Sequence, residues 1–336
     1  MKLSNWFVRD GAERPLIWPC VTLVLLCGLN LWVNPHFLSL RMLDGHLFGA
    51  PIDVLNRAAP LALVATGMTL VIATRGIDIS VGAVVAIAGA AAATILATQP
   101  TPSAGLIAQA LVAALIVGVL SGMWNGLLVS FVGMQPIIAT LILMVAGRGI
   151  AQLLTAGQII PIGAPGYLFV GGGYWLGVPC SVWIASVAVL ATAVLVEGTA
   201  LGLFIRAIGV NPVATRLVGL RSKALVFAVY GFSGLTAAMA GILISSNVRS
   251  ADGNNAGLLL ELDAILAVTL GGTSLLGGRF SLTGTVLGAL IIQFLDSGLL
   301  LMDVGIGQRM IIIGQVLIVA VAFDVGYRRW TGERLA

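Results

Sequence analysis

Long runs without a charged residue are the feature that most restricts how this chain folds. Residues 58–74 form one such run and residues 81–98 form another. A membrane-spanning helix needs about 20 predominantly apolar residues. Only 9% of the chain is charged, against about 25% in ordinary soluble domains, and a transmembrane barrel would alternate apolar and polar residues. The sequence therefore predicts an all-α, polytopic integral membrane protein.

About ten transmembrane helices account for the apolar runs, within one transmembrane domain that covers residues 1–336. The expected spans are 16–34, 57–74, 80–98, 106–132, 136–156, 179–197, 223–246, 262–278, 283–301 and 309–326. The second and third spans, and the eighth and ninth, are short and separated by glycine-containing breaks. The first span is interpreted as retained, because no A-x-A-like cleavage site follows it.

The basic residues predict that both termini lie in the cytoplasm, because cytoplasmic segments carry an excess of Lys and Arg. With this orientation, twelve basic residues are on the inner side: Lys2, Arg9, Arg14, Arg75, Arg206, Arg216, Arg221, Lys223, Arg279, Arg328, Arg329 and Arg334. Five are on the outer side: Arg41, Arg57, Arg148, Arg249 and Arg309. The same topology explains the net charge of +4, which is not taken as a sign of nucleic-acid binding.

Several classes of chemistry are excluded by what the chain lacks. A P-loop needs a lysine after glycine, but Lys2 follows Met and Lys223 follows Ser. Any ATP, with its Mg²⁺, must therefore be bound by another chain. The three cysteines have no CxxC spacing, and there are only two histidines, so a metal or redox site is not expected. No GxSxG or HExxH motif is present, and we expect no catalytic residue or cofactor in this chain.

The polar segment at 198–222 is predicted to hold a short exposed helix on the cytoplasmic side. Asn211 followed by Pro212 is typical of an N-cap with proline at the first helical position, and Gly219 is typical of a helix end. The intervening residues, with Arg216, are too few to span a membrane or to be stable alone. The helix is interpreted as a docking element for a partner protein; the alternative is a solvated surface turn.

Polar residues at membrane depth are costly and usually face protein or water. The candidates for a translocation pathway are Asp78, Ser80, Asn125, Thr273 and Ser274. A structural interpretation competes with this one, because Asp78 or Ser80 could instead cap the third span and brace the break before it.

Glycines mark two further patterns. Gly118, Gly122 and Gly126 form a doubled GxxxG ladder, which favours close helix packing either within one subunit or between subunits. "GIDISVGAVV" (76–85) and "GRFSLTGTVL" (278–287) both repeat glycine after six positions. Paired glycine-broken spans are typical of the substrate pathway in transporters built from internal repeats, so a true repeat and a chance likeness both remain open.

The chain resembles a known family, the permease subunits of bacterial ABC importers for ribose, arabinose, xylose and galactofuranose. The resemblance covers nearly the whole chain. It is carried by "GMTLVIATRGIDISVGAVVAIAGA" (67–90), "QPIIATLILMVAGRGIAQLLTAGQ" (135–158), "ALGLFIRAIGVNPVATRLVGL" (200–220) and "ELDAILAVTLGGTSLLGGRFSLTGTVLGALI" (261–291). The segments at 50–74 and 254–268 are most similar to the galactofuranose branch. One departure is Arg75, where the family usually has glycine.

The resemblance implies a permease in the bacterial inner membrane that imports a monosaccharide. It implies three kinds of protein partner: an ABC ATPase that hydrolyses ATP, a periplasmic sugar-binding protein, and a second permease chain, identical or related. It also implies that 198–222 is the ATPase-coupling loop, with Asn211, Pro212, Arg216 and Gly219 as its residues.

Some alternatives stay open at the level of sequence. A self-contained secondary transporter, with Asp78 or Asp296 carrying a coupling proton, would explain the buried acids but not the docking helix. Arg75 is interpreted either as a positively charged anchor on the cytoplasmic side or as a partner of Asp78. The sugar, its ring form and the composition of the dimer are not determined by these residues.

Overall fold

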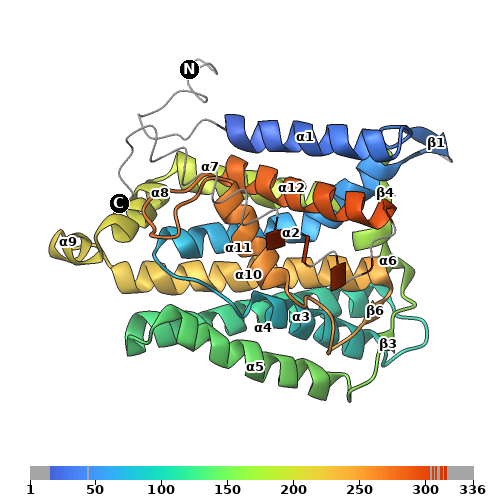
Figure 1. Cartoon of the computed structure of the whole chain (residues 1–336). Coiled ribbons are helices and arrows are strands. Elements are labelled where there is room, and N and C mark those ends of the chain that lie inside the picture. Colours follow the sequence, from blue (N-terminus) through green and yellow to red (C-terminus); the bar gives the residue numbers. More distant parts are fainter. Residues whose placement is uncertain are drawn as a thin grey trace.

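The computed structural model describes residues 16–302 except 44, together with 305, 307–308, 311–312 and 314–315. Within them, the long helices form one bundle (Figure 1): α1 (Ile17–Val33), α2 (Ala50–Ala73), α3 (Val81–Leu96), α4 (Ala104–Leu127), α5 (Pro136–Leu154), α7 (Cys180–Gly198), α10 (Ser222–Val248) and α12 (Leu282–Leu301). The shorter helices are α6 (Pro165–Gly172), α8 (Ala200–Val210), α9 (Pro212–Leu217) and α11 (Leu260–Leu270). A π-helical turn, η2 (Leu128–Val132), extends α4.

Among the described residues, the strands form short antiparallel pairs. They are β1 (Arg41–Leu43) with β2 (His46–Phe48), β3 (Ile160–Pro161) with β6 (Ser250–Ala251), and β4 (Tyr174–Trp175) with β5 (Val178–Pro179). All three pairs lie at the end of the bundle opposite α8 and α9 (Figure 1). We call this end the hairpin end.

The prediction of an all-α polytopic membrane protein is confirmed. Six described helices are long and apolar enough to cross a membrane, namely α2, α4 with η2, α5, α7, α10 and α12. The apolar helices α1 and α3 are slightly shorter, at 17 and 16 residues. The tenth predicted span, 309–326, lies almost wholly outside the described residues.

The predicted span at 262–278 is wrong in its second half. The helix α11 ends at Leu270 and has 11 residues, about 16 Å at 1.5 Å per residue, too short to cross the hydrocarbon core. Gly272, Gly277 and Gly278 have φ values of 87°, 82° and 80°, which are outside the helical region and favour glycine. The segment contains no charged residue from 264 to 278, but the glycines break the helix.

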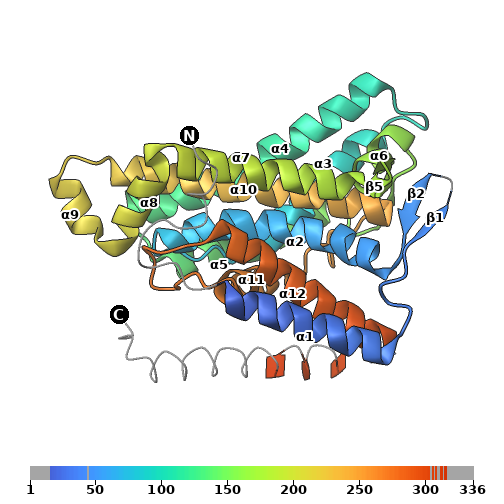
Figure 2. The same cartoon turned by 90° about the horizontal axis from the view of Figure 1, so that it is seen from above.

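Two helices form the centre of the bundle. In its most apolar 18-residue stretch, α2 is 83% buried, and nearly every residue of α3 is buried. The corresponding stretches of α4 and α7 are only 22% buried, because they pack on one face and leave apolar side chains on the other. Figures 1 and 2 agree that α2 and α10 run between the outer helices. The outer faces are apolar, as expected for surfaces that contact lipid.

The glycine ladder of α4 packs within this subunit. A β-carbon at Gly122 would collide with the carbonyl of Tyr230, and one at Gly118 would collide with Ala238, both on α10. The ladder therefore lets α4 and α10 approach closely. Of the two interpretations of this motif, packing within one subunit is confirmed.

The end opposite the hairpins carries basic residues from several elements, and we call it the basic end. It contains α8, α9, the segment 74–80 after α2 and the segment 271–281 after α11 (Figure 1). Six of the basic residues assigned to the cytoplasm lie on these elements or at the start of α10: Arg75, Arg206, Arg216, Arg221, Lys223 and Arg279. This grouping agrees with the orientation predicted from the sequence.

Candidate functional site

A buried polar cluster fills the break between α2 and α3. The Ser80 hydroxyl donates to Asp78 Oδ1 at 2.6 Å, and the Ser233 hydroxyl of α10 donates to Asp78 Oδ2 at 2.9 Å. The Asn125 amide of α4 donates to Ser80 Oγ at 2.7 Å and to Asp78 Oδ1 at 3.3 Å. Three of the five predicted pathway residues therefore meet in one place.

The cluster braces the backbone where α3 begins. Asp78 Oδ1 also accepts the backbone N–H of Ser80 at 3.1 Å, whereas the Ser80 side chain caps no N–H of α3. All four side chains are at most 1% exposed. In this conformation the Asp78 carboxylate contacts protein groups from three elements and is closed to solvent.

Two residues of this region have no sequence signal of their own. Ser233 lies within an apolar span, and nothing local marks it as a partner of Asp78. Tyr230, one turn earlier on α10, places its ring and hydroxyl against Gly76, where a β-carbon would collide with them. Within the described chain, the buried Tyr230 hydroxyl and Asn125 Oδ1 have no hydrogen-bond partner.

The other two pathway candidates, Thr273 and Ser274, lie in the segment 271–281. The Thr273 hydroxyl accepts the backbone N–H of Ser281 at 3.3 Å, and the Ser274 hydroxyl accepts that of Leu276 at 3.3 Å. Both side chains thus bond within their own segment. The structure places neither of them in hydrogen-bond contact with Asp78.

The short exposed helix predicted in the loop 198–222 is confirmed as α9. Asn211 Oδ1 accepts the backbone N–H groups of Val213 and Ala214, each at 3.0 Å, and Pro212 is the first helical residue. Gly219 has φ 84°, and the N–H of the next residue, Leu220, bonds to the Thr215 carbonyl at 3.1 Å, which is a Schellman end. The loop 198–222 also contains α8, for which no helix was predicted from the sequence.

The outward surface of α9 is apolar. Val213, Leu217 and Val218 are 65%, 85% and 79% exposed. These three residues are here called the α9 knob, and α9 itself projects from the basic end of the bundle (Figure 1).

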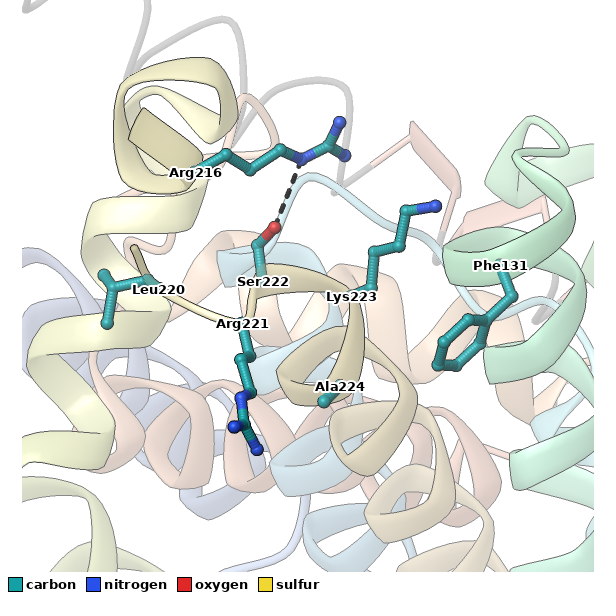
Figure 3. A pocket seen from close by; sticks show the side chains of 7 residues that line it. All are labelled: Phe131, Arg216, Leu220, Arg221, Ser222, Lys223 and Ala224. Carbon is teal, nitrogen blue, oxygen red and sulfur yellow. Dashed lines mark hydrogen bonds between the residues drawn. The ribbon is translucent and has the colours of Figure 1, made fainter. Parts of the chain in front are cut away.

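A hollow of about 370 Å³ lies beside α9. It is lined by Phe131, Arg216, Leu220, Arg221, Ser222, Lys223 and Ala224. Figure 3 shows Arg216 lying over Ser222, with Lys223 on the side toward Phe131; Arg216 Nε donates to Ser222 Oγ at 3.2 Å. The hydrogen bond holds Arg216 at the rim of the hollow, next to the α9 knob.

Arg75 does not pair with Asp78, so that interpretation is wrong. Its guanidinium donates from Nε to the Gly209 carbonyl at 2.5 Å and from Nη2 to the Val210 carbonyl at 2.6 Å. These carbonyls belong to the last turn of α8, where the helix dipole favours a cation. The carboxylate of Asp78 is instead occupied by Ser80, Asn125 and Ser233.

Comparison with known proteins identifies the family. Residues 50–321 match the family described as branched-chain amino acid transport system, permease component. The chain belongs to this family. The matched residues include both the Asp78 cluster and the loop with α8 and α9.

Individual relatives are sugar permeases by name. The chain is 50% identical to the galactofuranose transporter permease protein YtfT of Escherichia coli K12, with 86% of this chain and 85% of the relative covered. It is 40% identical to the fructose import permease FruF of Bifidobacterium longum, over 90% and 85%, and 38% identical to the ribose import permease RbsC of E. coli K12, over 90% and 92%. No solved structure matched the chain.

Proposed function

We propose that this permease is the membrane subunit of an ATP-driven sugar importer in the bacterial inner membrane. It takes a monosaccharide from a periplasmic binding protein and releases it into the cytoplasm. The observation that carries the proposal is the 50% identity to a galactofuranose permease over most of both chains. The same relative favours galactofuranose as the sugar, over the ribose and fructose of the more distant relatives.

The structure supports a docking role for α9. The helix is capped at both ends, so its short length is stabilised without tertiary packing on its outer face. Its apolar knob and the neighbouring Arg216 are exposed at the basic end, where an ATPase in the cytoplasm would bind. Asn211, Pro212, Arg216 and Gly219 are the residues that shape and present this element. ATP and Mg²⁺ would be held by the ATPase partner.

The function is tested by reconstituted transport. Vesicles containing the permease, its ATPase and its binding protein should accumulate radiolabelled galactose, whose solution equilibrium includes the furanose form, only when ATP is supplied. Uptake that continues without ATP and stops when the proton gradient is dissipated would instead support a secondary transporter. Competition by unlabelled ribose and fructose distinguishes the candidate sugars.

Docking through the α9 knob has its own test. Leu217→Asp places a charge on a side chain that is 85% exposed, so the permease should still insert while co-purification of the ATPase falls at least tenfold. A matched control is Leu176→Asp, at a residue that is 75% exposed in the turn between β4 and β5 at the hairpin end. Equal recovery of the ATPase with both variants would contradict the assignment of α9.

A further inference from the structure

Arg75 occupies a backbone conformation that favours glycine. Its φ is 66°, directly after the C-cap of α2, where Arg75 N–H bonds to the Ile72 carbonyl at 2.9 Å and Gly76 N–H to the Val71 carbonyl at 3.0 Å. This is a Schellman end, and its left-handed position usually holds glycine. A residue with a β-carbon is disfavoured there, so local backbone geometry does not account for an arginine.

The side chain provides the compensating interaction. Its two hydrogen bonds reach Gly209 and Val210, more than 130 residues further along the chain. The last carbonyls of a helix lack partners within the helix, and a guanidinium there also complements the dipole. Arg75 therefore joins the end of α2 to the end of α8.

A third segment closes around the same point. The Gly278 N–H donates to the Ala73 carbonyl at 2.9 Å. A β-carbon at Gly277 would approach Arg75 Cγ, and one at Gly209 would collide with Ala73 and Gly278. The break after α2, the end of α8 and the segment 271–281 are thus in direct contact, with no room for larger residues.

The contacts lie between the docking helix and the centre of the bundle. Asn211 follows Val210 and is the N-cap of α9, so a displacement of α9 moves the carbonyls that Arg75 holds. On the other side, Arg75 is three residues before Asp78, in the break between the two most deeply buried spans. Arg75 is therefore one of the groups that connect α9 to the break holding the Asp78 cluster, beside the backbone contacts among Ala73, Gly209 and Gly278.

We propose that Arg75 is a positioning residue that transmits ATPase-driven movement of α8 and α9 to the break between α2 and α3. The inference rests on the proposed function, since it needs an ATPase on α9. It assigns Arg75 to coupling, and neither to sugar binding nor to ATPase binding.

Arg75→Gly is the decisive variant, because glycine suits φ 66° and removes only the side-chain link. In vesicles with the ATPase and binding protein, we expect normal ATPase recovery, a melting temperature within a few degrees of the parent, and continued ATP hydrolysis. Radiolabelled galactose transported per ATP hydrolysed should fall about tenfold. Arg75→Lys, which keeps the cation but not the two-pronged donor, should give an intermediate ratio.

Arg249→Gly is a matched control. Arg249 also has a left-handed φ, 58°, directly after a long helix, α10, but at the hairpin end. Its replacement should leave the ratio of transport to hydrolysis unchanged. A parental ratio with Arg75→Gly would overturn the inference, as would loss of ATPase recovery, which would make Arg75 a docking residue. Failure of the parent chain to recover an ATPase would instead overturn the proposed function.

Discussion

The two breaks in the bundle are alike in sequence and different in construction. The first, 74–80, places an acid in the core, where three side chains from two other elements and the break itself donate to it. The second, 271–281, has glycines at its turns and exposes Leu275 and Leu276, which are 47% and 62% exposed. The first is held by buried hydrogen bonds, and the second by close backbone contacts.

The difference shows two ways of stabilising a break between helices in one bundle. The hydrogen bonds that Asp78 accepts favour one conformation of the first break, because each lost bond would leave a desolvated group. Segment 271–281 has exposed side chains, so a lost hydrogen bond there leaves fewer polar groups buried without a partner. The two following helices also begin differently, since Ser281 Oγ caps α12 by accepting the Gly284 N–H at 3.1 Å, whereas the Ser80 hydroxyl donates to Asp78.

The largest effect is expected at Asp78. Asp78→Leu leaves the donors of Ser80, Asn125 and Ser233 buried without their acceptor, at about 1–3 kcal/mol each. The free energy of unfolding, measured by detergent denaturation in mixed micelles, should fall by about 3 kcal/mol or more. Asp53→Leu, at an exposed acid in the first turn of α2, should cost less than about 1 kcal/mol. Equal losses would show that the first break does not depend on its buried acid.

The second break should respond most at its tight glycine contact. Gly278→Ala introduces a β-carbon at φ 80° that would press on Val210, and we expect a loss of about 2 kcal/mol or more in the same denaturation measurement. Gly219→Ala has nearly the same φ, 84°, with nothing within 4 Å of the new atom. It should cost about 1–2 kcal/mol from backbone strain alone. If the two losses are equal, packing around segment 271–281 contributes nothing.

A smaller effect is expected at the cap of α12. Ser281→Ala removes the acceptor for the Gly284 N–H and should lower the free energy of unfolding by about 1 kcal/mol. Ser281→Asp keeps an acceptor at the helix N-terminus and should restore most of the loss. A full loss with both variants would mean that the cap is not what the serine contributes.

The smallest effect is expected at Leu275. Its side chain is 47% exposed, and Leu275→Ser should change the free energy of unfolding by no more than about 0.5 kcal/mol. ATPase recovery measured on the same sample should also match the parent. A large drop in recovery with unchanged stability would make the second break part of the docking surface and would sharpen its contrast with the first.

Local patterns were enough to predict much of this structure. The apolar runs located α2, α3, α4, α5, α7, α10 and α12, because crossing the hydrocarbon core requires a stretch of about 20 apolar residues, although α2 begins at Ala50 and not at the predicted residue 57. The pair Asn211–Pro212 and the glycine at 219 predicted both ends of α9, because capping involves backbone groups within one turn. The span 262–278 was wrong because the glycines after Leu270 adopt left-handed conformations that end α11.

Contacts across the chain could not be predicted in this way. The sequence marked Asp78, Ser80 and Asn125 as unusual polar residues but carried no sign that Ser233 joins them, 155 residues after Asp78. It left Arg75 with two interpretations, and its actual partners, Gly209 and Val210, became visible only when α8 was placed beside the end of α2.

The sequence by itself determined that this chain is a membrane protein, that a break follows α2, and that a short capped helix is exposed. Hydropathy, glycine conformation and capping are all properties of neighbouring residues. Only the tertiary structure decided that the first break is held by the buried Asp78 and that the Arg75 side chain bonds this break to the end of α8. Those choices depend on which helices pack together, and a single hydrogen bond between distant segments leaves no pattern in the residues beside it.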